Sequence, residues 1–566
     1  MYRTRIIILL TLTLAGKLTL AQDLETIGKK DPLQLSGGLS LNQIFYGVNG
    51  IESRRDPYSY FLSGNLNLSL YGWSVPLSFA VSNQNQSFQQ PFNQYGLHPT
   101  YKWATAHLGY ASMTFSPYTL SGHIFRGAGV ELKPEKFTFS AMYGQLRRAV
   151  EADTLRNTTP AYERNGFGFK TGYRSGGDVA EVSMFYGKDE ESSLRMLPQD
   201  KPPLPEENLV LGISLGKQVL ERFSVMVDYA SSALTRDMRD ESGAVDNLFS
   251  KLGFDGNAST SFYDAWKASL SYQNQQTSVG VAYERIDPGY RTHGAYYFNN
   301  DLENFTINAS SMLLDARLSV GASVGVQRDN LDNSKMSTMN RAVGSINASL
   351  SATERLSVNL NYSNFQSYTN IRSQFVNINQ LTPYDNLDTL QFTQIAQNLN
   401  LGANYILSQN REKQQTILVN FSVQDAAERQ GQVSENSGSR FYNVNASYSV
   451  NFVPRNLMLM FAYNLNENQS PLIQVLTHGP TASLNKSLLD RKMRLSLAAS
   501  HNMTSAQGNS LSRIVNVRTS AGYVAKKQHH FSVGLTALNR TTGGEKGDTT
   551  FTEFTGTVTY SYSFSR

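Results

Sequence analysis

Short segments in which apolar and polar residues alternate one by one constrain this chain more than any other feature. The segment 355–363, "RLSVNLNYS", sets Leu and Val against Ser and Asn at every second position. The same period returns in 317–327, 443–450 and the tail 556–566. Because successive side chains of a strand point to opposite faces, each segment predicts a β-strand with one apolar and one polar face.

The composition of the two faces indicates where such strands would lie. The polar faces carry Ser, Asn and Gly rather than the Lys and Glu that coat a soluble sheet, and many apolar faces end in an aromatic residue, such as Tyr362 or Tyr448. This pattern is typical of transmembrane β-barrels. Short and long connections alternate, and parity gives about 26 strands, with 24 as the fallback. We predict an all-β, single-chain antiparallel transmembrane β-barrel with both termini periplasmic.

The N-terminus predicts export. Arg3 and Arg5 precede an apolar run over 6–15, and small residues follow at the position that a signal peptidase reads. No 18-residue apolar run follows, so no membrane helix is expected, and the bacterial outer membrane is the predicted location. The predicted organisation is a signal peptide (1–21), a short periplasmic segment (22–33) and the barrel (34–566).

Composition and motifs argue against several classes of function. The chain has no Cys, so disulfides and thiolate metal sites are excluded. The net charge of +5 falls to +2 when the three basic residues of the signal peptide are removed, and no basic patch suggests nucleic acid. The eight His show no metal spacing, and neither G-x-S-x-G nor H-E-x-x-H occurs. We therefore expect no enzyme activity, no cofactor and no metal.

The C-terminal tail predicts a closing strand and a partner. Its alternating residues Gly556, Tyr560, Tyr562 and Phe564 resemble the signal by which barrel-assembly machinery recognises its clients. The expected partners are this machinery during insertion, outer-membrane lipid, and an outer-membrane or secreted protein.

Parity also assigns charged residues to the inner face. Phe167 and Phe169 would face lipid, so Lys170 and Arg174 would point into the lumen. The same rule places these residues there: Glu131, Glu181, Arg222, Asp228, Lys267, Arg494 and Arg518. The simpler interpretation is interior salt bridges or solvated wall charges, and the sharper one is a mixed-charge ring that tunes which solutes pass.

The segment 113–144 is the most individual part of the chain. Gly122, Gly127 and Gly129 would allow a bend or a close backbone approach. The simpler interpretation is a hairpin outside the membrane. The alternative is a loop folded inward as a constriction, formed by Phe115, Ser116, Pro117 and Tyr118.

Part of the chain resembles uncharacterised, large porin-like outer-membrane proteins of Bacteroidetes. The segments that carry the resemblance are 54–79, 89–103, 116–132 and 140–151. It implies a fold and a location, and it brings no substrate or site residue.

Two functions remain open. The first is a channel that passes solutes or an extended polymer through a polar lumen, partly closed by loops such as 232–258 and 367–388. The second is a non-conducting interaction or assembly component whose surface loops, such as 287–300, bind protein partners. Stoichiometric co-purification with a closed pore would favour the second.

Overall fold

The computed structural model describes residues 33–83, 93–152, 160–196, 202–243, 248–335, 340–364, 367–369, 393–427, 439–470, 473–543 and 548–565. The predicted signal peptide and much of the 367–388 segment lie outside these residues. The first half of the sheet comprises β1 (Leu33–Asn49), β2 (Tyr58–Leu70), β3 (Trp73–Ser82), β4 (Gln94–Leu97), β5 (Thr100–Tyr101), β6 (Ala104–Thr114), β7 (Ser121–Leu132), β8 (Phe137–Arg147), β9 (Glu163–Ser175), β10 (Asp178–Glu190), β11 (Glu207–Val219), β12 (Phe223–Thr235), β13 (Thr260–Gln273) and β14 (Thr277–Ile286).

The second half comprises β15 (Leu302–Leu313), β16 (Leu318–Arg328), β17 (Asn340–Ser351), β18 (Leu356–Ser363), β19 (Ser367–Thr369), β20 (Thr393–Gln409), β21 (Lys413–Ala427), β22 (Ser439–Phe452), β23 (Leu457–Gln469), β24 (Gln474–Leu488), β25 (Met493–Ala506), β26 (Asn509–Ala525), β27 (His529–Thr542) and β28 (Thr549–Ser565). Short helical turns are η2 (Glu191–Ser193), α2 (Leu248–Lys251) and η4 (Val453–Arg455). No helix in the described part of the chain is long and apolar enough to cross a membrane.

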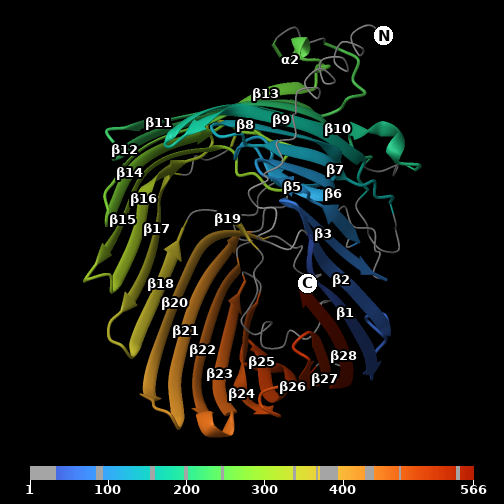
Figure 1. The fold of residues 1–566 in the computed structure, drawn as a ribbon, viewed down its shortest axis with the longest axis vertical. Coiled ribbons are helices and arrows are strands. Elements are labelled where there is room, and N and C mark those ends of the chain that lie inside the picture. The colour runs from blue at the N-terminus through green and yellow to red at the C-terminus, as the bar shows by residue number, and fades with distance from the viewer. Residues whose placement is uncertain are drawn as a thin grey trace.

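The sheet closes on itself. β1 pairs antiparallel with β28 from Ser36↔Ser565 to Asn49↔Thr552, and the two strands lie side by side in Figure 1. β4 and β5 both pair with β3 and β6, and β18 and β19 both pair with β20, so each of these two pairs fills one position in the wall. The 28 described strands therefore occupy 28 − 2 = 26 positions, which confirms the predicted 26-strand antiparallel barrel.

The two faces of the wall follow the predicted alternation. Large apolar side chains such as Val324, Phe554 and Leu535 are more than half exposed, although each belongs to a fully paired strand. A closed barrel that exposes an apolar outer face is stable only when lipid covers that face. The protein is thus a transmembrane barrel of the bacterial outer membrane, as predicted.

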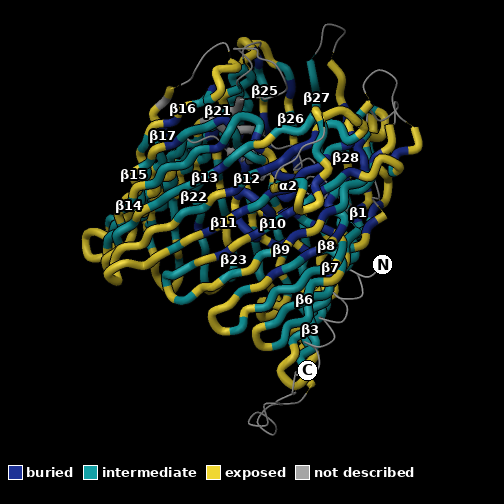
Figure 2. Tube along the Cα trace, turned by 90° about the horizontal axis from the view of Figure 1, so that it is seen from above, coloured by how far each residue is buried: buried dark blue, intermediate teal, exposed yellow. Residues whose placement is uncertain are grey.

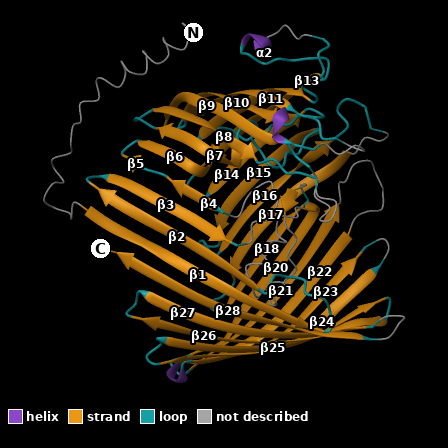
Figure 3. Ribbon diagram, turned by 90° about the vertical axis from the view of Figure 1, so that its right-hand side faces the viewer, coloured by secondary structure: helices purple, strands orange, loops and turns teal. Residues whose placement is uncertain are grey.

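Connections at the two ends differ in length. Short turns join alternate strands and gather at the left edge of Figure 3. Several adopt left-handed backbone angles without Gly, as at Leu489, Asp490 and Arg491. The short turns, such as those at 314–317 and 453–455, join paired strands, and the longer connections lie at the other end.

Burial is uneven around the ring. The dark blue positions of Figure 2 concentrate in the wall formed by β8 to β13, and most buried apolar residues belong to residues 111–290. Three buried clusters lie in this part of the barrel. Other segments of the chain therefore cover this sector of the wall.

Candidate functional site

The β6–β7 hairpin leaves the wall and enters the barrel. β7 pairs with β6 over its whole length, but it pairs with β8 only from Arg126 to Leu132. The hairpin beyond Arg126 is therefore free of the neighbouring strand on that side. We call residues 115–120 the hairpin tip.

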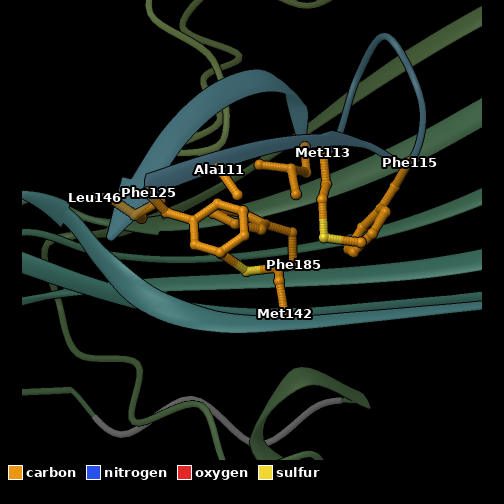
Figure 4. Close-up of a cluster of buried hydrophobic side chains, with 8 residues drawn as sticks. Ala111, Met113, Phe115, Phe125, Met142, Leu146 and Phe185 are labelled. Atoms are coloured by element: carbon orange, nitrogen blue, oxygen red, sulfur yellow. The ribbon is translucent and has the colours of Figure 1, made fainter. Parts of the chain in front are cut away.

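An apolar cluster fixes the hairpin against the inner face of the wall. Figure 4 shows Met113, Phe115 and Phe125 reaching toward Met142 and Phe185, and all five are nearly fully buried. Met142 and Phe185 alternate with the exposed residues of β8 and β10, so they face the lumen. The structure thus contradicts the simpler interpretation of an outside hairpin. The use of the tip as a constriction remains a prediction.

The tip has its own internal hydrogen bonds. The Ser116 hydroxyl lies 2.8 Å from the Thr119 hydroxyl and accepts the backbone N–H groups of Tyr118 and Thr119. The backbone N–H of Phe115 donates to the Leu120 carbonyl over 2.8 Å. Ser side chains commonly close turns in this way, and they give this short loop one shape.

Glycines on the inner face make room for the inserted groups. A Cβ at Gly168 would lie 2.9 Å from the Phe115 ring, and one at Gly212 would lie 2.8 Å from the Thr119 side chain. On β10, a Cβ at Gly187 would lie 2.9 Å from the Cβ of His293. Such distances are too short for ordinary contacts, so the wall accepts the insertion only because these positions lack side chains.

A second segment meets the tip inside the barrel. The loop between β14 and β15, residues 287–300, places the Tyr290 hydroxyl 2.7 Å from the Tyr118 carbonyl and the Thr292 hydroxyl 2.8 Å from the Thr119 carbonyl. The Tyr118 hydroxyl in turn donates to Glu284 of β14 over 2.6 Å. We call the hairpin tip and residues 287–300 together the inner assembly.

The inner assembly packs on the wall with aromatic side chains. Tyr290 is completely buried, and its ring lies 6.5 Å from Tyr118 and 5.0 Å from Phe298. Small and branched wall residues receive these rings: Val210, Ala230, Ala265 and Ile286. Burial raises the pKa of the Tyr290 phenol, so it stays protonated and able to donate.

A buried charge cluster holds the β14–β15 loop to the wall. Arg164 binds Asp189 over 2.7 Å and Glu206 over 2.9 Å. Glu206 also contacts Arg291 over 3.2 Å and the Nε2 atom of His293 over 3.3 Å. The Glu206 carboxylate therefore links two residues of the loop to Arg164 of the wall.

The pKa values of His293 and of Glu206 are both lowered. Burial and the nearby Arg164 lower the pKa of His293 to about 4, against the opposing effect of Glu206. Burial alone would raise the pKa of Glu206, but His293, Arg291 and Arg164 hold it well below its usual range. At neutral pH, a neutral imidazole thus faces an ionised carboxylate.

Two of the predicted inner charges, Asp228 and Lys267, form one row with Glu284. Asp228 pairs in register with Lys267, which pairs in register with Glu284. The Lys267 Nζ atom lies 3.8 Å from Glu284, and Ser214 donates to Asp228 over 2.5 Å. The row alternates with the exposed outer residues Val279 and Val281, which places it on the lumen side.

The other predicted charges are dispersed. Arg174 contacts Glu181 over 3.1 Å, Glu131 contacts Lys133 over 2.6 Å, and Lys170 lies 3.5 Å from the Thr114 carbonyl. Arg222 lies in the turn between β11 and β12 rather than within a strand. Arg494 and Arg518 are exposed on β25 and β26, away from the row. Their effect on solute passage remains a prediction.

One predicted internal loop lies outside instead. Phe249 and Phe254, around α2, pack against Leu209, Leu211 and Met184. These residues share the face of the exposed Val182 and Ile213, which is the outer face. Figure 1 places α2 beyond β13, outside the ring. The expectation that 232–258 folds inward was wrong for its described residues. Phe249 and Phe254 are buried against apolar residues of the outer face, and this contact holds the segment outside the barrel.

The predicted tail forms the closing strand. Residues Gly556 to Phe564 of β28 pair with β1, and Tyr562 stacks on Phe564 with ring centroids 5.4 Å apart. Recognition of this strand by assembly machinery remains a prediction.

A cavity of about 430 Å³ lies beside the root of the hairpin, where the Nδ1 atoms of His98 and His107 are 3.0 Å apart. Within the described ranges, no group of three or more His, Asp or Glu is arranged to hold a metal ion.

Comparison with known proteins finds chains that are similar in fold, but no related sequence. No family model matches the chain, and no curated protein matches it. The resemblance to Bacteroidetes outer-membrane proteins therefore remains a prediction.

Several solved outer-membrane proteins are similar in structure. A chain of the E. coli P pilus tip assembly intermediate PapC–PapD–PapK–PapG matches with a TM-score of 0.43 and 12% identity, over 94% of this chain and 60% of that one. The FrpB iron transporter of Neisseria meningitidis matches with a TM-score of 0.37 and 9% identity, over 93% and 82%. OprD of Pseudomonas aeruginosa matches with a TM-score of 0.33 and 10% identity, over 72% and 92%. At these values the likeness carries no argument about function, and the closed barrel rests on its own strand pairing.

Proposed function

We propose that this protein is an outer-membrane channel whose lumen is narrowed by the inner assembly. The observation that carries the proposal is the Tyr118–Glu284 hydrogen bond, which joins the hairpin tip to a strand seven wall positions away from β7. A loop held in this way occupies part of the interior. A barrel of 26 strands encloses a wide lumen, and the polar inner faces favour water within it.

The inserted segments fit closely against the inner face of the barrel. Gly168, Gly187 and Gly212 leave space for them, and the apolar cluster around Phe115 and Phe185 is buried. Such an arrangement supports a narrowed pore rather than an empty one. The charged row Asp228–Lys267–Glu284 would border the narrowed part and influence the ions that pass.

The test is single-channel conductance of the purified barrel in a planar bilayer. Thr114 and Ser121 are cross-strand partners, so a two-residue Asn-Gly turn can replace residues 115–120 without altering the strands. We expect the wild-type barrel to conduct and the shortened variant to conduct several-fold more. The matched control is Phe254→Ala, which alters a segment on the outer face.

The outcomes separate the two functions. Equal conductance of wild type and shortened variant would show that the tip does not narrow the pore. A silent barrel that remains silent after shortening, and that co-purifies with a stoichiometric protein, would support an interaction component instead.

A further inference from the structure

Six neighbouring strands carry no charge on their inner faces. β18 and β20 contain no Asp, Glu, Lys or Arg, and β21 to β24 contain five such residues within their described spans. All five share a face with exposed outer residues such as Val419, Phe461 and Leu484: Lys413, Asp425, Arg440, Glu467 and Lys486. The lumen side of this sector is therefore neutral.

Asparagines dominate this neutral face. They lie side by side in two rows of the strand register, Asn361–Asn400–Ser422–Asn443–Asn466 and Asn359–Gly402–Asn420–Asn445–Asn464. We call these two rows the amide wall. Its members bond to one another: Asn445 donates to Asn464 over 2.5 Å, and Asn466 donates to Asn443.

The inner assembly leaves this sector uncovered as far as the described residues show. The hydrogen bonds and ion pairs of its described residues join it to β7, to β10–β14 and to residues next to these strands. None of these contacts reaches β18 or β20–β24. Asn400, Asn420, Asn445 and Asn466 are half-buried rather than sealed. Among the described residues, the inner assembly thus lies against the charged sector, and the amide wall faces the part of the lumen that these residues leave open.

We propose that the amide wall selects neutral polyhydroxylated solutes, such as small oligosaccharides. This inference rests on the proposed channel function and names its substrate class. An Asn side chain both donates and accepts, as a sugar hydroxyl does, so each can replace water around the other. A charged solute finds no opposite charge there and loses hydration without compensation. Repeated, equivalent contacts would let a solute enter and leave quickly.

The experiment measures solute entry into proteoliposomes by swelling. Maltose is compared with potassium lactobionate, an anionic disaccharide of similar size, and conductance of the same preparation is recorded in a planar bilayer. We expect maltose to enter at least five-fold faster than lactobionate. This comparison uses the wild-type protein, so it does not depend on any variant that must fold.

Two variants localise the effect. Asn420→Leu/Asn445→Leu removes amides from the wall and should slow maltose several-fold while ionic conductance stays within two-fold. Asn304→Leu is the matched control, because Asn304 is a buried inner-face amide of β15 next to Glu284 in the charged sector. It should leave the maltose rate unchanged. Heat-modifiable migration on gels checks that each variant is folded.

Each outcome has a distinct meaning. Conductance with equal entry of maltose and lactobionate would overturn the amide-wall inference and leave the channel intact. Equal slowing by Asn304→Leu would also overturn it. A preparation with neither conductance nor swelling would instead refute the proposed channel.

Discussion

The hydroxyl of Tyr118 lies 2.6 Å from the carboxylate of Glu284, although 166 residues separate them in the chain. This bond ties the tip of one hairpin to a strand across the interior of the barrel. The position of the tip thus depends on a contact that can be removed without changing any strand.

Tyr118→Phe should loosen the tip. A hydrogen bond to a charged group contributes about 1.5–3 kcal/mol, so its loss favours the undocked tip by roughly ten-fold or more. We expect more frequent openings to a higher conductance level in single-channel records. Identical gating records for wild type and Tyr118→Phe would contradict this role of the bond.

Gly212→Ala should push the tip away from the wall. The added Cβ would come within 2.8 Å of Thr119 and 2.7 Å of the Ser183 hydroxyl, so the contact between tip and wall must shift. We expect raised conductance with an intact barrel. Gly321→Ala is the control, since its Cβ would meet nothing closer than 3.9 Å. Equal effects of the two substitutions would argue against steric docking.

Acid should weaken the attachment of the β14–β15 loop. The pKa of His293 is lowered in the docked state, so the undocked loop binds a proton more readily, and docking weakens as pH falls from about 6.5 toward 4. The lowered pKa of Glu206 acts in the same direction at lower pH. Arg164, Arg291 and Asp189 are the other charged groups that border the site.

This pH dependence is measured as conductance between pH 7.5 and 4.5. We expect openings to increase on acidification in wild type, and the change above pH 4.5 to be reduced in His293→Gln. A wild-type conductance that is constant with pH would show that the loop stays docked when His293 becomes protonated.

Lys267→Met should make the pore more cation-selective. It removes the one cation of the row and leaves Asp228 and Glu284 without it. Reversal potentials in a salt gradient measure the change, and Lys217→Met is the control, because Lys217 lies outside the row and pairs with Asp178. A reversal potential that Lys267→Met does not move would place the row away from the ion path.

Phe254→Ala should release the segment around α2 from the outer face. Truncating a buried Phe typically costs about 3–5 kcal/mol, and Phe254 is 2% exposed. We expect protease to cut residues 236–259 faster in intact cells while conductance is unchanged. A conductance change would instead link this segment to the interior.

The fold could be predicted because apolar and polar residues alternate with a period of two along the strands. The alternating segments 317–327, 355–363 and 443–450 correspond to β16, β18 and part of β22. The position of the loops could not be predicted in the same way. The hydrogen-bond partner of Tyr118, Glu284, lies on a distant strand, and the sequence around residue 118 contains no pattern that predicts this contact. The available signal was glycine at inner-face positions such as Gly168 and Gly212, which mark where the wall is approached.

The seam between β1 and β28 also has a consequence for biogenesis. It pairs residues more than 500 positions apart, as in Ser40 with Ser561, so closure joins the first strand made to the last. Until then, both edges expose unpaired backbone groups that invite pairing with other chains. A chain cut short by even one hairpin cannot form this seam. The barrel can therefore close only after every strand of the wall has been synthesised.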